Sequence, residues 1–217
     1  MSIREGFAQG LARQLGRPEG LRGRVVGRML NRRNARVVAA AVEATGLRAG
    51  QIGADIGFGG GLGLRLLLDR VGRDGRVHGV EVSDTMLVAA ERRHRQEITA
   101  GRLALQRGTL GALPIEDGTI DGLITVNTLY FVEDVTAAFR ELARVLSPSG
   151  RAVVGVADPA FLETMPVAAH GFRLRQPDEL VAGLTAAGLR VQHERLGSDP
   201  AVFHLLLARS AAFRDDG

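Results

Sequence analysis

The chain has 217 residues, of which 45% are hydrophobic and 24% charged, as in a globular domain with a sizeable core, and it shows no repeat or low-complexity segment. It contains no cysteine, which excludes disulfides, thiolate metal sites and a cysteine nucleophile, and we expect no metal centre. The formal charge is only +4, and every basic residue is arginine, which favours a GC-rich bacterial genome. No segment approaches ~18 consecutive apolar residues and the first residues lack a secretory signal, so we expect a cytoplasmic protein without a membrane span.

The first 46 residues carry two helical patterns of apolar residues. The first pattern repeats every four residues, at Ile3, Phe7, Leu11 and Leu15, and the second occupies residues 25–42 after a turn at 16–20. Eight arginines crowd residues 13–36. They form either the solvated face of these helices or a basic surface for an acidic substrate, a phosphate-bearing partner or anionic lipid.

From about residue 50 the pattern changes to strands that alternate with helices. Apolar runs predict strands at 51–56, 76–81, 103–107, 120–126, 151–157, 189–196 and 202–208. Helical patterns lie at 61–72, 84–100, 134–146 and 177–187, and Asp134 and Pro177 suit the starts of the last two. The last two strands are joined by a short turn-forming segment. The sequence therefore predicts an α/β fold with a doubly wound, mostly parallel seven-stranded sheet that ends in an antiparallel hairpin.

A glycine-rich segment, Ala54 to Gly63, follows the first strand and opens a helix. Glycines there allow a tight turn and close approach of the backbone to a ligand. Asp55 stands two residues before the first glycine, where a carboxylate suits a cationic ligand better than a pyrophosphate. Glu81 ends the second strand, where it can accept hydrogen bonds from both hydroxyls of a ribose. A third stretch, 112–121, precedes a strand that ends at Asn127.

In combination these motifs resemble the class I S-adenosylmethionine (SAM)-dependent methyltransferases, in particular the small-molecule branch that includes the ubiquinone/menaquinone-type enzymes. The resemblance covers residues 50–157 and the final hairpin. It implies methyl transfer from SAM, with S-adenosylhomocysteine (SAH) as product, by in-line displacement onto a small and partly apolar metabolite. It also implies that residues 1–46 form an N-terminal helical lid over a SAM-binding domain at 47–217.

The resemblance further implies a set of cofactor-binding residues. Those in and after the first two strands are Asp55, Gly57, Phe58, Gly59, Glu81, Val82 and Met86, with Val82 and Met86 against the adenine. Many relatives place an aspartate after the third strand, but this chain has Thr109 and Leu110, and the Thr109 hydroxyl is a weaker acceptor than a carboxylate. Asn127 belongs to a motif beside the methionine portion of the cofactor. Phe58 either packs over the cofactor or fills the core.

Two residues are candidates for the catalytic step. His170 lies in a non-periodic connection after the fifth strand, which in similar enzymes covers the acceptor, so it is our candidate for a base. Tyr130 either contacts the acceptor or belongs to the core. The other histidines are assigned no catalytic role: we expect His78 in a strand, His94 on a helix surface, and His193 and His204 as structural residues of the hairpin.

Three other functions remain as alternatives. An NAD-dependent oxidoreductase shares the topology, but it does not explain Asp55 or the terminal hairpin. A nucleic-acid methyltransferase is suggested by the arginine-rich N-terminus, although residues 127–130 lack the Pro-Pro signature of many base-methylating enzymes, and a small-molecule acceptor is favoured. A SAM-binding fold with a non-methylating role is the third alternative. A homodimer is left open.

Overall fold

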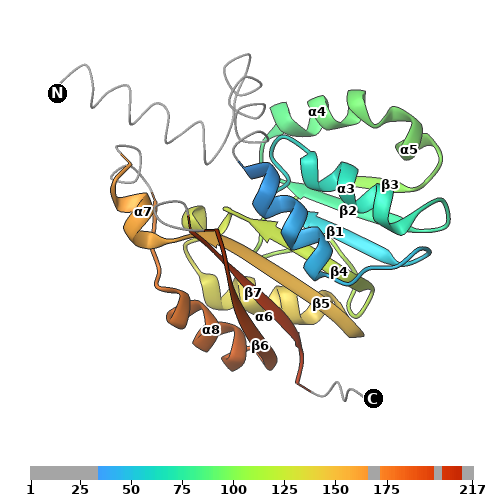
Figure 1. The fold of residues 1–217 in the computed structure, drawn as a ribbon. Helices are drawn as coiled ribbons and strands as arrows, with labels where there is room; N and C mark the ends of the chain where they lie inside the picture. Colours follow the sequence, from blue (N-terminus) through green and yellow to red (C-terminus); the bar gives the residue numbers. More distant parts are fainter. Residues whose placement is uncertain (1–33, 166–171, 198–201, 212–217) are drawn as a thin grey trace, which may run out of the picture.

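The computed structural model describes residues 34–165, 172–197 and 202–211. A seven-stranded sheet crosses the molecule in the order β3-β2-β1-β4-β5-β7-β6 (Figure 1). The strands are β1 Ile52–Ile56, β2 Arg76–Glu81, β3 Leu103–Arg107, β4 Ile120–Val126, β5 Leu146–Ala157, β6 Leu189–Leu196 and β7 Phe203–Ser210. Neighbours from β3 to β5 pair in parallel, whereas β7 pairs antiparallel with both β5 and β6. The predicted doubly wound sheet with a terminal antiparallel hairpin is confirmed.

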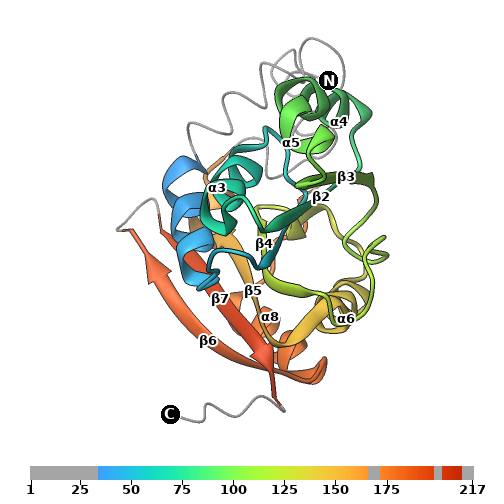
Figure 2. The same cartoon turned by 90° about the vertical axis from the view of Figure 1, so that its right-hand side faces the viewer.

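Helices cover both faces of this sheet. The labelled α-helices are α3 Leu62–Val71, α4 Asp84–Arg93, α5 Arg95–Thr99, α6 Val135–Val145, α7 Pro159–Glu163 and α8 Pro177–Ala186. Helical residues 34–44 and α3 pack on one face with α4, and α6 and α8 pack on the other (Figure 2). Each face has its own buried cluster, around Phe139 and Leu142 on one side and around Leu64 and Leu67 on the other. This arrangement explains why residues 152–157 of β5 form a continuous apolar run and why β4 is mostly apolar, since these residues are buried under helices on both faces.

The starts of α6 and α8 are set by capping residues that the sequence predicts. The side chain of Asp134 accepts a hydrogen bond from the Ala137 amide at 2.9 Å and so caps α6, as predicted. Pro177 occupies the first turn of α8, also as predicted, and Gln176 and Glu179 form a capping box there. These capping residues therefore determine where α6 and α8 begin.

Four details differ from the sequence-based expectations. β5 begins at Leu146 because that residue pairs with Ile120, and a register shift then absorbs the turn-like residues 147–150. The helix expected at 84–100 is broken at His94, and the break interrupts the periodicity that had placed His94 on the surface, so this ring is buried. The short helix α7 and the 3-10 helix η1, Leu129–Phe131, follow strands without a helical pattern of their own.

The predicted N-terminal lid, residues 1–46, lies mostly outside the described residues. Helical residues 34–44 are described, and Val37, Ala41 and Val42 anchor them to the sheet. No helix among the described residues is long and apolar enough to cross a membrane.

Candidate active site

A cavity of about 850 Å³ opens at the carboxyl ends of β1, β2, β4 and β5. This is the edge at which open α/β sheets bind ligands, because the loops after the parallel strands meet there. Ten of the twelve residues predicted from the sequence line it: Asp55, Gly57, Phe58, Gly59, Glu81, Val82, Thr109, Leu110, Asn127 and Tyr130. Met86 is buried below this surface and is absent from the lining, and His170 lies outside the described residues.

The glycine-rich loop after β1 is tightly packed. Gly57 has a φ of 74°, and a Cβ at this position would lie 2.5 Å from the Thr128 hydroxyl. A Cβ at Gly63 would overlap the Asp55 carboxylate. The Gly57 amide donates to the Val80 carbonyl at 2.8 Å, which ties the loop to β2. Glycine is therefore required at both positions, and the loop can bring its backbone close to a ligand.

Asp55 lies at the base of this loop and is buried. Burial, reinforced by the nearby Glu81 carboxylate, raises the pKa of Asp55 to about 8, and a hydrogen bond from the Leu64 amide opposes part of the rise. A carboxylate that is so costly to ionise is a favourable partner for a cation that enters the cavity. Asp55 also contacts the first turn of α3 through the Leu64 amide, so it supports the shape of the loop in addition to attracting a cation.

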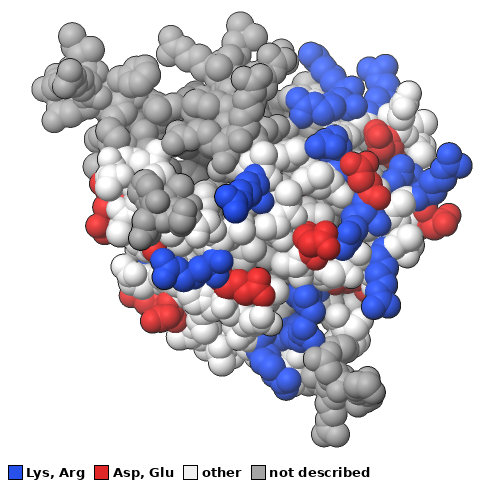
Figure 3. All heavy atoms as spheres, in the orientation of Figure 1, with Lys and Arg blue, Asp and Glu red and all other residues white. Residues whose placement is uncertain are grey.

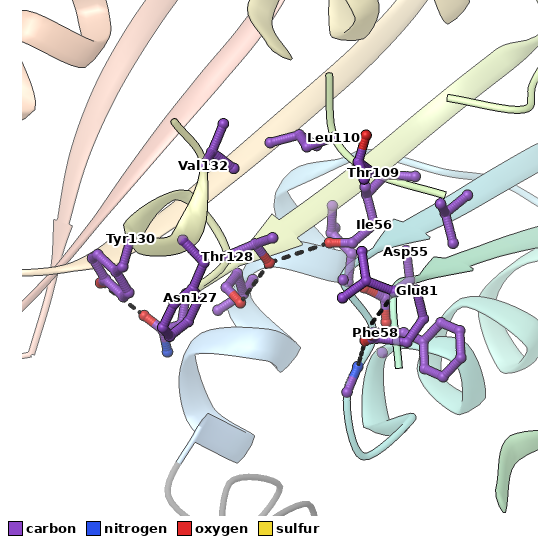
Figure 4. Close-up of a pocket in the computed structure, with 18 of the residues that line it drawn as sticks. Asp55, Ile56, Phe58, Glu81, Thr109, Leu110, Asn127, Thr128, Tyr130 and Val132 are labelled. Atoms are coloured by element: carbon purple, nitrogen blue, oxygen red, sulfur yellow. Dashed lines mark hydrogen bonds between the residues drawn. The ribbon is translucent and has the colours of Figure 1, made fainter. Parts of the chain in front are cut away.

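Glu81 organises the loop from the end of β2. One carboxylate oxygen accepts from the Gly59 amide at 2.9 Å (Figure 4), and the other accepts from the amides of Val82 and Ser83 at 2.8 and 3.0 Å. The acid thus stands at the strand end where a ribose would lie. The three amides take three of the four acceptor sites of the carboxylate, so one site on Oε2 is left for a ribose hydroxyl. Ser83 next to it caps α4 by accepting from the Met86 amide.

The loop after β3 closes this end of the cavity. Thr109 pairs with Ala112 in an isolated bridge, and Leu110 is buried beside it. Phe58 lines the cavity and also packs toward Gly79 of β2, where a Cβ would lie 3.1 Å from its ring, so it both fills the core and faces the ligand space. Together with the glycine-rich loop, Glu81 and Val82, these residues form what we term the glycine-loop half of the cavity.

The segment after β4 forms the centre of the cavity. Asn127 has a φ of 58°, and among the described residues it is the one non-glycine with positive φ. Its side-chain oxygen accepts from the Tyr130 hydroxyl at 3.0 Å (Figure 4), and that hydroxyl accepts from the Ala157 amide at 2.6 Å. Burial raises the pKa of the Tyr130 hydroxyl above its usual range. Tyr130 is therefore held as a neutral phenol with two protein partners.

The opposite end, which we term the aromatic half, is apolar. Phe172 stacks on Tyr130 with ring centroids 5.4 Å apart and meets Phe131 edge-on at 4.9 Å. Further apolar lining comes from Phe161, Leu162, Met165 and Phe203. The aromatic half thus offers a surface suited to a flat or lipophilic group.

An arginine that the sequence did not single out fixes the aromatic half. The Arg175 guanidinium donates to the carbonyls of Leu129 and Val132 at 2.8 and 2.7 Å, and the Arg173 amide donates to the Tyr130 carbonyl at 2.9 Å. These bonds join the segment after α7 to η1, although more than 40 residues separate Arg175 from its partners. Thr128 also lines the cavity and belongs to the same motif as Asn127, although it was not singled out, whereas no motif marks the lining residues Asn34 and Val38.

The charges around the cavity are of one sign. Among the described lining residues the acidic ones are Asp55, Glu81, Glu133 and Asp134, and none is basic. SAM carries a sulfonium and an ammonium cation, a ribose diol and an adenine. The paired acids at the glycine-loop half fit the cations and the diol, and the glycine positions leave room for a backbone-close ligand, so these residues fit the cofactor.

Comparison with known proteins agrees with this geometry. Residues 54–154 match the methyltransferase domain family. The chain is 32% identical over 115 residues to 2-phytyl-1,4-naphtoquinone methyltransferase of Trichormus variabilis, covering 52% of this chain and 50% of that protein. It is 31% identical over 144 residues to the ubiquinone/menaquinone biosynthesis C-methyltransferase of Klebsiella pneumoniae, covering 65% of this chain and 57% of that protein.

Among solved structures, geranyl diphosphate C-methyltransferase of Streptomyces coelicolor superposes with a TM-score of 0.71 at 16% identity, covering 97% of this chain and 99% of that one. This likeness concerns the fold. The matched segment spans about half the length, or less, of most of the curated relatives.

Proposed function

We propose that this chain, which belongs to the class I SAM-dependent methyltransferases, transfers the methyl group of SAM to a small, partly apolar and uncharged metabolite. The observation that carries the proposal is the division of one cavity into two halves. The glycine-loop half offers buried acids and backbone amides, and the aromatic half offers apolar rings. An acceptor in the aromatic half would lie beside the reactive end of a cofactor in the glycine-loop half.

When bound, SAM supplies a methyl group on a positively charged sulfur, which a nucleophilic atom of the acceptor takes by in-line displacement. The residues of this chain contribute alignment and a dry environment for that transfer. Glu81 and the glycine-rich loop hold the nucleoside portion, and Asp55 favours the cationic portion. Phe172, Phe131 and Tyr130 hold the acceptor and exclude water. His170 remains our candidate for a base, for an acceptor that must lose a proton.

The charge of the cavity supports an uncharged acceptor. A diphosphate needs cations around it, either basic side chains or a metal ion such as the Mg²⁺ in the Streptomyces coelicolor complex. The described lining residues of this cavity include no basic side chain, and no group of three or more possible metal ligands occurs among the described residues. A neutral ring compound or a lipophilic hydroxyl compound meets no such penalty.

The surface supports a small molecule over a nucleic acid as acceptor. On the face drawn in Figure 3, acidic side chains are interspersed with the arginines, including those over α4 and α5. Nucleic-acid binding calls instead for a continuous basic surface. A cytoplasmic location and a homodimer belong to the same proposal, and cell fractionation and sedimentation of the purified protein test them.

Transfer of a labelled methyl group tests the proposal. Purified protein is incubated with methyl-labelled SAM and a panel of acceptors that contains neutral phenols and quinols, prenyl diphosphates and RNA. We expect label in a neutral acceptor and none in the other two classes, and we expect the E81A variant to lose this transfer. Label in RNA or in a diphosphate would contradict the proposed acceptor. Tight SAH binding without any methylated product across broad acceptor extracts would favour a non-methylating role.

A further inference from the structure

The amide of Asn127 has a defined orientation, which follows from the hydrogen bonds of Tyr130. A phenol hydroxyl has one proton to donate. Because the Tyr130 oxygen already accepts the Ala157 amide at 2.6 Å, its proton needs an acceptor, and Asn127 Oδ1 provides one at 3.0 Å. A flipped amide would present its NH₂ group to the phenol and leave the buried hydroxyl proton unpaired, which is unfavourable. Asn127 Nδ2 therefore points away from Tyr130 (Figure 4).

The backbone holds the same residue in place. Asn127 has a positive φ, and its backbone N–H donates to the Gly155 carbonyl at 2.8 Å. The next residue, Thr128, packs against Gly57. Asn127 thus stands between the glycine-loop half and the aromatic half with both its backbone and its side-chain oxygen engaged. Within the described part of the chain, its Nδ2 group has no hydrogen-bond partner, although Asn127 lines the cavity.

A fixed donor at this place is matched by one group of the proposed cofactor. With the ribose at Glu81, the end of β4 is a neighbouring part of the cavity that the amino-acid portion would reach, because Thr128 packs against Gly57 of the glycine-rich loop. It ends in a carboxylate, and every charged residue among the described lining residues is itself a carboxylate. Among the described lining residues only neutral donors can bind such a carboxylate, and Asn127, whose Nδ2 points away from Tyr130, offers one of them.

We propose that Tyr130 is a positioning residue, which locks the Asn127 amide so that Nδ2 donates to the carboxylate of the amino-acid portion of SAM and SAH. The proposal rests on SAM being the cofactor. Tyr130 then acts on the cofactor only through Asn127. The contribution of the Tyr130 hydroxyl to the affinity for SAH should therefore disappear when Asn127 is replaced or when the ligand lacks its carboxylate.

Binding of two matched ligands tests this assignment. SAH and decarboxylated SAH differ only in the carboxylate, and their dissociation constants are measured for the wild type, Y130F, N127A and the double variant. We expect Y130F and N127A each to weaken SAH by about three- to thirtyfold, as for loss of one charge-assisted hydrogen bond, and to leave decarboxylated SAH within twofold. In the double variant SAH should bind no more weakly than to N127A, because both changes remove the same interaction.

The other outcomes overturn the assignment. An equal loss for both ligands would mean that Tyr130 only supports the fold, and additive losses in the double variant would mean that Tyr130 and Asn127 act separately. Unchanged SAH binding would mean that Nδ2 faces another group, such as an oxygen of the acceptor. Failure of the wild type to bind SAH at all would instead overturn the proposed function.

A second variant avoids the loss of the Ala157 hydrogen bond in Y130F. N127D keeps the size of the side chain and the acceptor for Tyr130, but replaces the donor NH₂ by an oxygen. We expect SAH to bind at least tenfold more weakly to N127D, since two carboxylates would then face each other, and decarboxylated SAH to bind as well as before or better. Equal binding of SAH by N127D and the wild type would contradict the assignment.

Discussion

The two halves of the cavity are built in different ways. The glycine-loop half comes from short segments at the ends of adjacent parallel strands. Its key contacts join Glu81 to Gly59 of the loop after β1 and to Val82, the next residue in the chain. The aromatic half is assembled from η1, α7 and the segment at 172–176, which lie far apart in the sequence and are tied together by Arg175 and by ring stacking. The first half is set by backbone geometry, which tolerates little change, and the second by side-chain packing, which permits substitution.

The largest effect is expected where the glycine-loop half is most crowded. G57A would force a side chain into a positive φ and against Thr128. We expect a loss of stability of roughly 2–5 kcal/mol, the sum of left-handed strain and overpacking, together with loss of SAH binding. Urea unfolding and calorimetric titration measure the two effects.

G50A is the matched control for that change. Gly50 has a φ of 84°, and a Cβ there would meet nothing within 4 Å. It should cost only about 1–2 kcal/mol and leave SAH affinity unaltered. Equal effects of the two variants on binding would show that crowding at Thr128 is irrelevant to the site.

The next effect concerns the acid that organises the same half. E81Q keeps the shape of the side chain but removes the charge that draws the Gly59, Val82 and Ser83 amides and would receive a ribose. We expect SAH to bind about 10- to 100-fold more weakly, since hydrogen bonds to charged groups contribute about 1.5–3 kcal/mol. E91Q, on the exposed face of α4, is the control and should bind like the wild type. Similar affinity for E81Q would refute the role of Glu81.

In the aromatic half a substitution should separate stability from cofactor binding. F172L keeps apolar bulk but removes the ring that contacts Tyr130 and Phe131. We expect a loss of about 0.5–1.5 kcal/mol of stability, as for an aromatic pair, with SAH affinity unchanged within twofold. A loss of SAH affinity as large as that of E81Q would show that the two halves are not independent.

The last effect is a pH dependence that arises at Asp55. With its pKa raised to about 8, Asp55 binds a proton in the folded protein that it releases in the unfolded chain, so the free energy of unfolding falls as the pH rises from about 4 to 8. A bound cation favours the ionised form. We therefore expect SAM affinity to rise by roughly three- to tenfold between pH 6 and 8 relative to D55N. D55N is the control because the ligand's own groups titrate in the same way with both proteins. Parallel pH profiles for the two proteins would contradict this coupling.

The same contrast explains what the sequence could predict. Asp55, the glycines and Glu81 sit at fixed offsets from strand ends, so strand periodicity was enough to bring them to one cavity. The hydrogen bonds of Arg175 and the stack of Phe172 on Tyr130 depend on contacts between distant segments, and no local pattern encodes them. The break at His94 and the extended start of β5 were missed for a related reason, because tertiary packing there overrides helical periodicity and turn signals.

The most direct test of the central claim is thermal unfolding of the purified protein with SAM, SAH and NADH in parallel. A ligand at about 100 times its dissociation constant stabilises the folded state by roughly 2.7 kcal/mol, which shifts the midpoint visibly. We predict a clear upward shift with SAM and SAH and none with NADH. A shift with NADH alone, or no shift with either sulfur ligand in folded protein free of carried-over ligand, would contradict the assignment of this cavity to SAM.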